Sequence, residues 1–170
     1  MKQLKFHIEE ELKNVSRTLI DISNDNLKIF SKLIKESKSK LNKKKIIFCG
    51  NGGSASHAQH LACELVVRYK NNRKAINAIS LTTDTSNLTA IGNDYDFKYI
   101  FSRQLDAIGN KGDICIFLST SGESKNIIEA AKIAKKKLIS CYSFSGKGGG
   151  KLKKIIKNNI IINSNLTSAI

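Results

Sequence analysis

The sequence predicts an α/β fold, a three-layer αβα sandwich around a five-stranded parallel sheet, preceded by two helices. Apolar residues recur at helical spacing up to about residue 42. From residue 43 onward, strand-sized apolar runs alternate with helical segments, a pattern typical of a parallel sheet with helices on both faces. A length of 170 residues favours one domain. Within residues 1–170 we therefore expect a helical pair over 1–42 and an α/β core over 43–170.

The two N-terminal helices are predicted from the spacing of their apolar residues. The first covers residues 3–22 and the second residues 24–41, with Asn24 or Asp25 as its N-cap. The apolar positions of the first helix are Leu4, Ile8, Leu12, Val15, Leu19 and Ile22, and those of the second are Leu27, Phe30, Leu33 and Ile34.

The elements of the core follow in alternating order. Strands are predicted over residues 45–49, 75–81, 113–118, 137–144 and 159–163. Helices are predicted over residues 54–69, 84–91, 97–108, 125–136 and 151–157, and the run Gly92-Asn93-Asp94 is expected to break the second of them. The sequence stops soon after the fifth strand, so we expect that a C-terminal helix covering the last unit is missing.

The charge of the chain invites a nucleic-acid hypothesis, which the distribution of the charge does not favour. The formal net charge is +15, from 29 basic and 14 acidic residues. Only four of the basic residues are Arg, the residue whose planar fork usually recognises phosphate and bases. The Lys residues are scattered along the chain rather than concentrated. We therefore expect neither a nucleic-acid nor a membrane partner, since no apolar run reaches the ~18 residues of a membrane span.

The cysteines indicate a reducing compartment. Cys49, Cys63, Cys115 and Cys141 form no C-x-x-C pair, so a zinc site made of thiolates is not expected. Three of them lie in apolar runs and are interpreted as small buried hydrophobes. The N-terminus leads into an acidic stretch, and no signal peptide is visible. We expect a cytoplasmic protein.

Ligands of open parallel sheets bind beyond the C-terminal ends of the strands, and three segments fall at that edge. The first is the segment 50–56, Gly-Asn-Gly-Gly-Ser-Ala-Ser, between the first strand and a helix. Glycines let the backbone approach a ligand closely, and a helix N-terminus offers free N–H groups to anions. A tight strand-to-helix turn would also explain this segment.

The second segment, residues 119–124, reads Ser-Thr-Ser-Gly-Glu-Ser and lies between the third strand and a helix. Its four hydroxyl groups suit a phosphate dianion held without a metal. A helix cap would need only one hydroxyl group, so the surplus favours a ligand.

The third segment places His57, His60 and Glu64 near one face of the helix that follows the glycine loop. A His and a carboxylate at this spacing can ligate one metal ion or pair an acid with a base. A partly buried His that is hydrogen-bonded to Glu is an equally good explanation of the spacing alone.

Together these segments resemble the SIS (sugar isomerase) domain family, and within it the phosphoheptose isomerases. The matching stretches are CGNGGSAS (49–56), HLACELVVRY (60–69), LTTDTSNLTAIGND (81–94), FSRQL (101–105), GDICIFLSTSGES (112–124) and GKGGGKL (146–152). GNGGS and STSGxS are typical of SIS domains broadly, whereas HxxxEL and IGND are the more specific marks of the heptose enzymes. The resemblance covers essentially the whole chain and implies a flavodoxin-like SIS fold.

The resemblance implies an isomerase that interconverts sedoheptulose 7-phosphate and D-glycero-D-manno-heptose 7-phosphate in heptose biosynthesis for surface polysaccharide, such as lipopolysaccharide or capsule. It implies a homotetramer with active sites between subunits and one zinc ion per subunit. The implied substrate contacts are Asn51, Gly52, Gly53, Glu64, Asn93, Asp94, Ser119, Thr120, Ser121 and Ser124. His60 and Glu64 would ligate the metal, and Glu64 would be the catalytic base.

The sequence departs from the family at its end, and two alternatives remain open. The family places a Gln and a second catalytic His on a C-terminal helix, which would lie beyond Ile170. The remaining zinc ligands are therefore expected there, and this chain is expected to have little activity by itself. The alternatives are a SIS protein without catalysis, of the type that binds a replication initiator, and a module that binds sugar phosphates or amino sugars. The pair His60 and Glu64 argues against the first, and IGND argues against the second.

Overall fold

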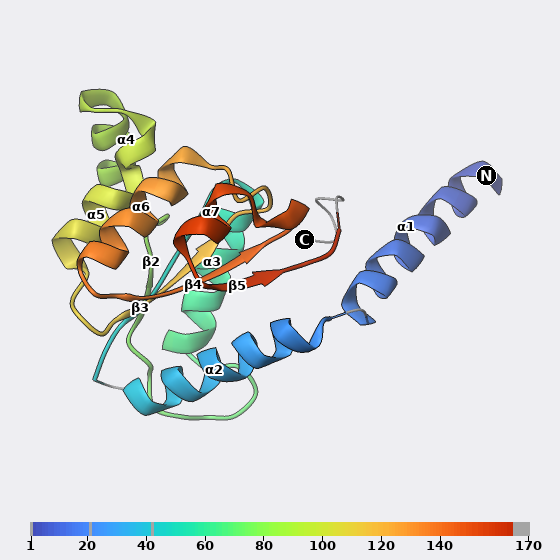
Figure 1. Cartoon of the computed structure of the whole chain (residues 1–170), viewed down its shortest axis with the longest axis horizontal. Helices are drawn as coiled ribbons and strands as arrows, with labels where there is room; N and C mark the ends of the chain where they lie inside the picture. Colours follow the sequence, from blue (N-terminus) through green and yellow to red (C-terminus); the bar gives the residue numbers. More distant parts are fainter. Residues whose placement is uncertain (1, 21, 42, 165–170) are drawn as a thin grey trace.

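The computed structural model describes residues 2–20, 22–41 and 43–164, and a five-stranded parallel sheet forms its centre (Figure 1). The strands are β1 (Ile46–Gly50), β2 (Ala78–Ser80), β3 (Ile114–Leu118), β4 (Ser140–Ser145) and β5 (Asn158–Ile161). Their order in the sheet is β2-β1-β3-β4-β5, and each neighbouring pair is parallel. The predicted fold class is confirmed.

Helices cover both faces of this sheet, as the alternating pattern predicts (Figure 1). They are α1 (Lys2–Ile20), α2 (Asn24–Lys40), α3 (Gly53–Val66), α4 (Thr85–Asp94), α5 (Ile100–Ile108), α6 (Lys125–Lys136) and α7 (Gly150–Ile155), with 3-10 turns η1 (Phe97–Tyr99) and η2 (Lys147–Gly149). Helices α2 and α3 pack on one face, and helices α4 to α7 pack on the other. None of the described helices is long and apolar enough to cross a membrane.

Two local predictions are wrong. The run Gly92-Asn93-Asp94 does not break α4, which continues to Asp94; Gly92 lies in open space, and a single helical glycine costs only ~1 kcal/mol. Helix α2 is capped by the side chain of Ser23, which accepts from the N–H of Asn26, rather than by Asn24 or Asp25. Residues 21 and 165–170, which fall in or after predicted elements, lie outside the described residues.

Strand β2 is shorter than the predicted strand over residues 75–81 because the chain before it bonds to a helix. The N–H of Ile76 donates to the carbonyl of Leu65 in α3 at 3.1 Å. Pairing with β1 begins only at Ala78. Tertiary contact with α3 therefore replaces ladder pairing over the first part of the predicted strand.

Strands β1 and β3 are buried along their whole length, so successive side chains enter two separate cores. Ile47 and Phe117 point to the core under α5 and α6, whereas Phe48 and Ile116 point to the core under α2 and α3. Cys49 and Cys115 are fully buried free thiols, as predicted, whereas Cys141, which the sequence predicts to be buried as well, is only partly buried. Burial raises the pKa of Cys115, and it raises the pKa of Cys141 to about 12, so both thiols stay neutral at physiological pH.

Helix α1 extends away from the body of the molecule, whereas α2 is fastened to the sheet (Figure 1). The side chain of Asn26 in α2 bonds both backbone groups of Ile161 in β5, at 2.8 and 3.1 Å. Glu36 in the same helix accepts from the hydroxyl of Tyr142 in β4 at 2.5 Å. Several apolar side chains of α1 are exposed, namely Leu4, Phe6, Ile8 and Leu12.

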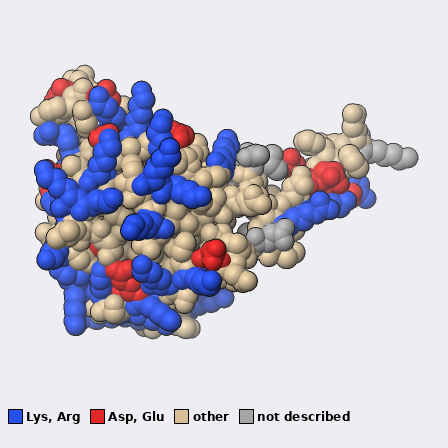
Figure 2. Space-filling model, in the orientation of Figure 1, with Lys and Arg blue, Asp and Glu red and all other residues tan. Residues whose placement is uncertain are grey.

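On the face that Figure 2 shows, the basic residues are spread over the body of the molecule rather than gathered at one place. Figure 2 shows Lys and Arg over most of the visible face of the body, with acidic side chains among them. Several Lys form ion pairs with a neighbour on the same helix, such as Lys28 with Asp25 and Lys132 with Glu129. On this face the distribution agrees with the scatter of the Lys residues along the sequence.

Asp113, just before β3, joins three parts of the chain although it is only 1% exposed. One carboxylate oxygen accepts from the N–H of Lys45 at 3.0 Å, and the other accepts from the N–H of Asn110 at 2.9 Å. The ammonium group of Lys45 lies 3.0 Å from the second oxygen. Burial alone would raise the pKa of Asp113, but these hydrogen bonds and the Lys45 ammonium lower it overall.

We predict that Asp113→Asn lowers the free energy of unfolding at pH 7 by ~3 kcal/mol, because it removes the charged partner of a buried ion pair. The folded-state pKa is lowered, so the stabilisation is complete above the unfolded value of ~3.9 and is lost as the pH falls through the folded value. Urea unfolding at pH 7 and pH 3 measures both effects. The control is Asp106→Asn at an exposed position, with an expected change within ~0.5 kcal/mol. A difference between wild type and Asp113→Asn that is equal at both pH values would contradict this account.

Candidate active site

Three loops meet beyond the C-terminal ends of β1, β3 and β4, comprising residues 50–53, 119–124 and 146–150. Backbone hydrogen bonds join the last two: the N–H of Gly146 donates to the carbonyl of Thr120 at 2.9 Å, and the N–H of Leu152 donates to that of Gly122 at 3.0 Å. The edge of the sheet where the sequence predicts ligand binding is therefore built from loops that support one another.

A cavity of about 150 Å³ opens between these loops. It is lined by Asn51, Ser54, Leu118, Ser119, Thr120, Ser121, Ser124 and Lys147. All four predicted phosphate-binding hydroxyl residues are among them, together with the predicted Asn51. The volume corresponds to roughly five water molecules at ~30 Å³ each, which is room for a phosphate group.

The hydroxyl group of Ser124 in this cavity does not cap the helix that follows it. Ser124 occupies the N-cap position of α6, yet its side chain makes no cap hydrogen bond. Its hydroxyl instead accepts from the hydroxyl of Ser119 at 3.3 Å. Ser124 also lies at the N-terminus of α6, where the first N–H groups of a helix have no intrahelical partner. The arrangement suits an anion with several acceptor oxygens.

Asn51 is held by a residue that sequence reasoning missed. Its side-chain amide exchanges two hydrogen bonds with that of Asn126, at 2.9 and 2.8 Å. Asn126 is 3% exposed and also accepts from the N–H of Ile127. This pair of side chains links the loop after β1, residues 50–53, to the start of α6. Nothing in the spacing of Asn126 along its helix signals the role, because its partner lies 75 residues away.

The loop over residues 119–124, called the serine loop below, requires glycine where it contacts the loop after β4. Gly122 has a φ of +65°, and a Cβ atom there would lie 2.1 Å from the carbonyl oxygen of Gly149. Gly150 approaches from the other side, where a Cβ would lie 2.6 Å from the carbonyl oxygen of Ser121. The two backbones touch, so side chains are excluded from this contact.

We predict that Gly122→Ala lowers the free energy of unfolding by ~2 kcal/mol, because it adds both the strain of a positive φ and a backbone clash. Thermal and urea unfolding measure the effect. The matched control is Gly92→Ala, where a Cβ meets no atom within 4 Å and the helical backbone favours Ala by ~1 kcal/mol. Equal stability of Gly122→Ala and wild type would contradict the packing described here.

His60 and Glu64 lie apart from this cavity, in an apolar groove of about 730 Å³ between α2 and α3. The Nε2 atom of His60 lies 3.9 Å from Oε1 of Glu64, so the predicted pair exists. Oε2 of Glu64 is buried and has no hydrogen-bond partner among the described residues. A buried carboxylate oxygen without a partner is costly, and it is therefore a candidate ligand or base. His57 is exposed and is not among the residues that line this groove.

The remaining predicted substrate contacts are not brought to the cavity within one chain. Asn93 and Asp94 lie at the end of α4, where the amide of Asn93 donates to the carboxylate of Asp94 at 2.8 Å. Asp94 lines a separate depression with Tyr95 and Arg103, whose guanidinium lies 4.0 Å from the ring centre of that tyrosine. Gly52 and Gly53 lie beside Asn51 at the start of α3.

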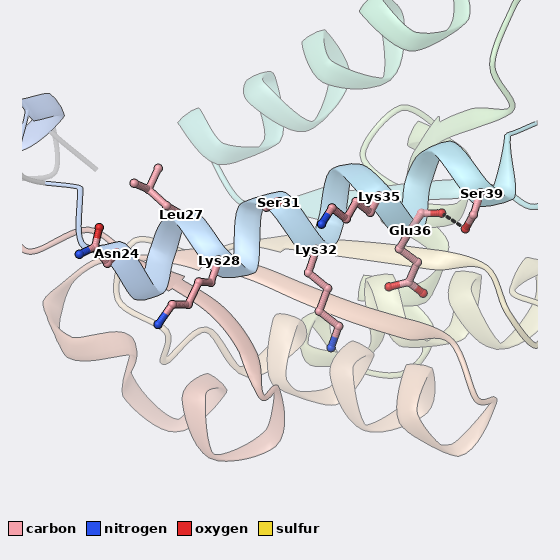
Figure 3. A pocket seen from close by; sticks show the side chains of 8 residues that line it. All are labelled: Asn24, Leu27, Lys28, Ser31, Lys32, Lys35, Glu36 and Ser39. Carbon is pink, nitrogen blue, oxygen red and sulfur yellow. Dashed lines mark hydrogen bonds between the residues drawn. The ribbon is translucent and has the colours of Figure 1, made fainter.

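A wide, open depression of about 1000 Å³ on the outer side of α2 carries none of the predicted site residues (Figure 3). Its most buried charged group is Glu36, which already bonds Lys40, Ser140 and Tyr142. These partners lower the pKa of Glu36 against the opposing effect of burial. The carboxylate is fully used in holding α2 to β4, so this depression offers no comparable chemistry.

The donor set for a metal ion is incomplete within the described part of the chain. His60 and Glu64 supply two ligand types that zinc accepts. No group of three or more His, Cys, Asp or Glu residues that could hold a metal occurs there. The unpartnered oxygen of Glu64 nevertheless fits a cation or a reacting proton.

Comparisons with known proteins agree with this geometry. Residues 8–146 match the model of the SIS domain family. The phosphoheptose isomerase of Campylobacter jejuni is 54% identical over 126 residues, which are 74% of this chain and 68% of that protein. The phosphoheptose isomerase of Nitratiruptor is 43% identical over 165 residues, which are 96% of this chain and 88% of that protein. The chain belongs to the phosphoheptose isomerase family.

Solved structures of phosphoheptose isomerases have the same fold. The structure from Neisseria gonorrhoeae superposes with a TM-score of 0.89 at 34% identity and covers 98% of this chain and 90% of that one. The structure from Francisella tularensis gives a TM-score of 0.92 at 30% identity, with 99% and 90% coverage. The similarity extends over the N-terminal helices as well as the core.

Proposed function

We propose that this protein interconverts sedoheptulose 7-phosphate and D-glycero-D-manno-heptose 7-phosphate through an enediol, in heptose biosynthesis for lipopolysaccharide or capsule. The observation that carries the proposal is the hydroxyl-lined cavity at the ends of β1 and β3 in a member of the phosphoheptose isomerase family. The phosphate would be bound by the hydroxyl groups of residues 119–124 and the N–H groups of α6. Asn51, Gly52 and Gly53 would contact the sugar.

The chemistry requires a base. Glu64 would take a proton from C1 of the ketose, the electron pair of that bond would form a double bond between C1 and C2, and the oxygen atom on C2 would take a proton from solvent to give the enediol. Return of a proton from Glu64 to C2, with loss of the hydroxyl proton on C1 to solvent, leaves the carbonyl group at C1 and completes the isomerisation. The unpartnered Oε2 of Glu64 supports this role because no hydrogen bond from a described residue competes for it. A positioned general base contributes typically 10²–10⁴-fold to the rate.

We further propose one zinc ion per subunit, held in part by His60 and Glu64. When bound, zinc supplies Lewis-acid stabilisation of oxygen atoms that gain negative charge. Two protein donors are fewer than the three or four of established zinc sites. Further ligands, in addition to the described residues, are therefore part of the proposal.

A homotetramer with active sites between subunits is part of the same proposal. The exposed apolar residues of α1 support it, because such a surface favours association. Asn93 and Asp94 do not line the phosphate cavity of their own chain, so a neighbouring copy would bring them to the substrate. We also propose a cytoplasmic location without a nucleic-acid partner, supported by the free thiols and the scattered Lys residues.

We predict that Leu12→Glu in α1 shifts the protein from tetramers to smaller species, because it places a charge on a face that another copy would bury. Sedimentation velocity measures the change. The control is Lys13→Glu. Lys13 lies one residue away and is also exposed, but it already carries a charge, so this substitution adds no charge to the apolar face. A wild-type chain that sediments as a monomer would contradict the assembly proposed here.

The function is tested with the chain extended by the C-terminal helix of a phosphoheptose isomerase, because the chain alone is expected to have little activity. This protein is incubated with sedoheptulose 7-phosphate and Zn²⁺ in D₂O. Formation of the aldose with deuterium at C2 is the expected result, because the enediol exchanges its proton with solvent. Glu64→Gln keeps the shape of the side chain but removes the base, so we predict a loss of ~10²–10⁴-fold in the exchange rate. Phosphate binding should be unchanged in this variant, because the cavity lies elsewhere.

The control is Gln59→Glu, an exposed position on α3 outside the groove, which should not alter the exchange rate. An unchanged rate in Glu64→Gln would rule out this residue as the base. If the wild type binds sugar phosphate but exchanges no deuterium, a SIS protein that binds without catalysis becomes the better assignment.

A further inference from the structure

Lys147 lies in the phosphate cavity although it is not among the predicted site residues. It is the one charged residue among those that line the cavity; the others carry hydroxyl, amide or apolar side chains. A phosphate dianion bound there by neutral donors alone would keep its charge uncompensated by any side chain of the lining. The lining of the cavity therefore includes one cation that can compensate the charge of a phosphate group.

The backbone holds Lys147 in place at some cost. Its φ is +48°, and Leu138 is the only other non-glycine residue of the described chain with a positive φ. This conformation is unfavourable for a residue with a Cβ atom. The N–H of the preceding Gly146 donates to the carbonyl of Thr120 in the serine loop. The hydrogen bond of Gly146 therefore holds the backbone next to Lys147 against the serine loop, which lines the cavity.

The acidic residue of the serine loop, Glu123, is already paired with another lysine. Its carboxylate accepts from the N–H of Lys151 at 2.8 Å and lies 2.9 Å from the ammonium of the same residue. These two interactions lower the pKa of Glu123. The structure shows no ion pair of Lys147 within the described residues, and its side chain is exposed at the mouth of the cavity. Lys151 therefore compensates the charge of Glu123, and the ammonium group of Lys147 remains available for a bound anion.

We propose that Lys147 supplies the positive charge that binds the phosphate group of the substrate, together with the hydroxyl groups of Ser119, Ser121 and Ser124. The inference rests on the proposed function and identifies the residue that selects a phosphorylated sugar over a neutral one. An ammonium group on a flexible stem can follow the phosphate as it settles among fixed hydroxyl groups. The role is binding, and it places no demand on the groove that contains Glu64.

The experiment titrates inorganic phosphate into the full chain labelled with ¹⁵N and follows the amide signals of residues 119–124. Lys147→Gln should weaken phosphate binding ~tenfold, as expected for loss of one charge-assisted hydrogen bond. Lys147→Arg keeps the charge and should remain within ~threefold of wild type. Lys147→Gly should weaken binding as much as Lys147→Gln, yet raise the unfolding temperature, because glycine adopts the positive φ without strain.

The matched control is Lys136→Gln, which makes the same change in net charge at the far end of α6 and should bind phosphate within ~twofold of wild type. Equal affinity in Lys147→Gln and Lys136→Gln overturns the inference while leaving the proposed function intact. Phosphate binding that depends on Lys147 in a chain that fails the deuterium assay has the opposite meaning: the inference holds and the isomerase proposal fails. Absence of any shift at residues 119–124 in the wild type overturns the inference as well.

Discussion

The burial of β1 and β3 on both faces is the constraint on which the rest of the structure depends. Every residue of these two strands is buried, so their own side chains form the two cores and leave none exposed to water. The hydroxyl and amide groups of the candidate site instead gather where the strands end, because the loops after β1, β3 and β4 meet there. The cavity with its four hydroxyl residues lies at the edge that parallel topology leaves open.

The two faces of the sheet are not covered equally, and this difference concerns the reaction. Helices α4 to α7 cover one core, whereas α2 and α3 leave an apolar groove on the other face, lined by Phe48, Ile116 and Phe144 of the sheet. Glu64 places a carboxylate oxygen in this groove without a described partner. Such an atom normally costs ~1–3 kcal/mol. A protein retains that cost most readily at a site where the atom binds a ligand or a proton.

Much of this arrangement is predictable from the sequence because it is encoded locally. Apolar runs that end in glycine or serine loops predict the strands, and the surplus of hydroxyl groups over residues 119–124 predicts the cavity. What escapes prediction depends on contacts between distant residues. Asn126 contributes to the site because its side chain bonds that of Asn51, and Gly122 is required because its backbone contacts that of Gly149. Lys147 is recognised as a site residue only once the structure shows that the loop after β4 lines the cavity. The predicted break at Gly92 is wrong because the hydrogen bonds of α4 stabilise the helix by more than one glycine destabilises it.

The length of the substrate constrains how the cavity and Glu64 can act together. Ser54 at the start of α3 lines the cavity, and Glu64 lies ten residues further on, ~15 Å along the helix axis at ~1.5 Å per residue. Six carbon–carbon bonds of ~1.5 Å span less than ~9 Å from C1 to C7. The carbon chain of a heptose phosphate alone therefore covers only part of this distance, and the phosphate ester and the Glu64 side chain must span the rest. A carboxylate supplied by a neighbouring copy would remove this demand, which agrees with the proposal of active sites between subunits.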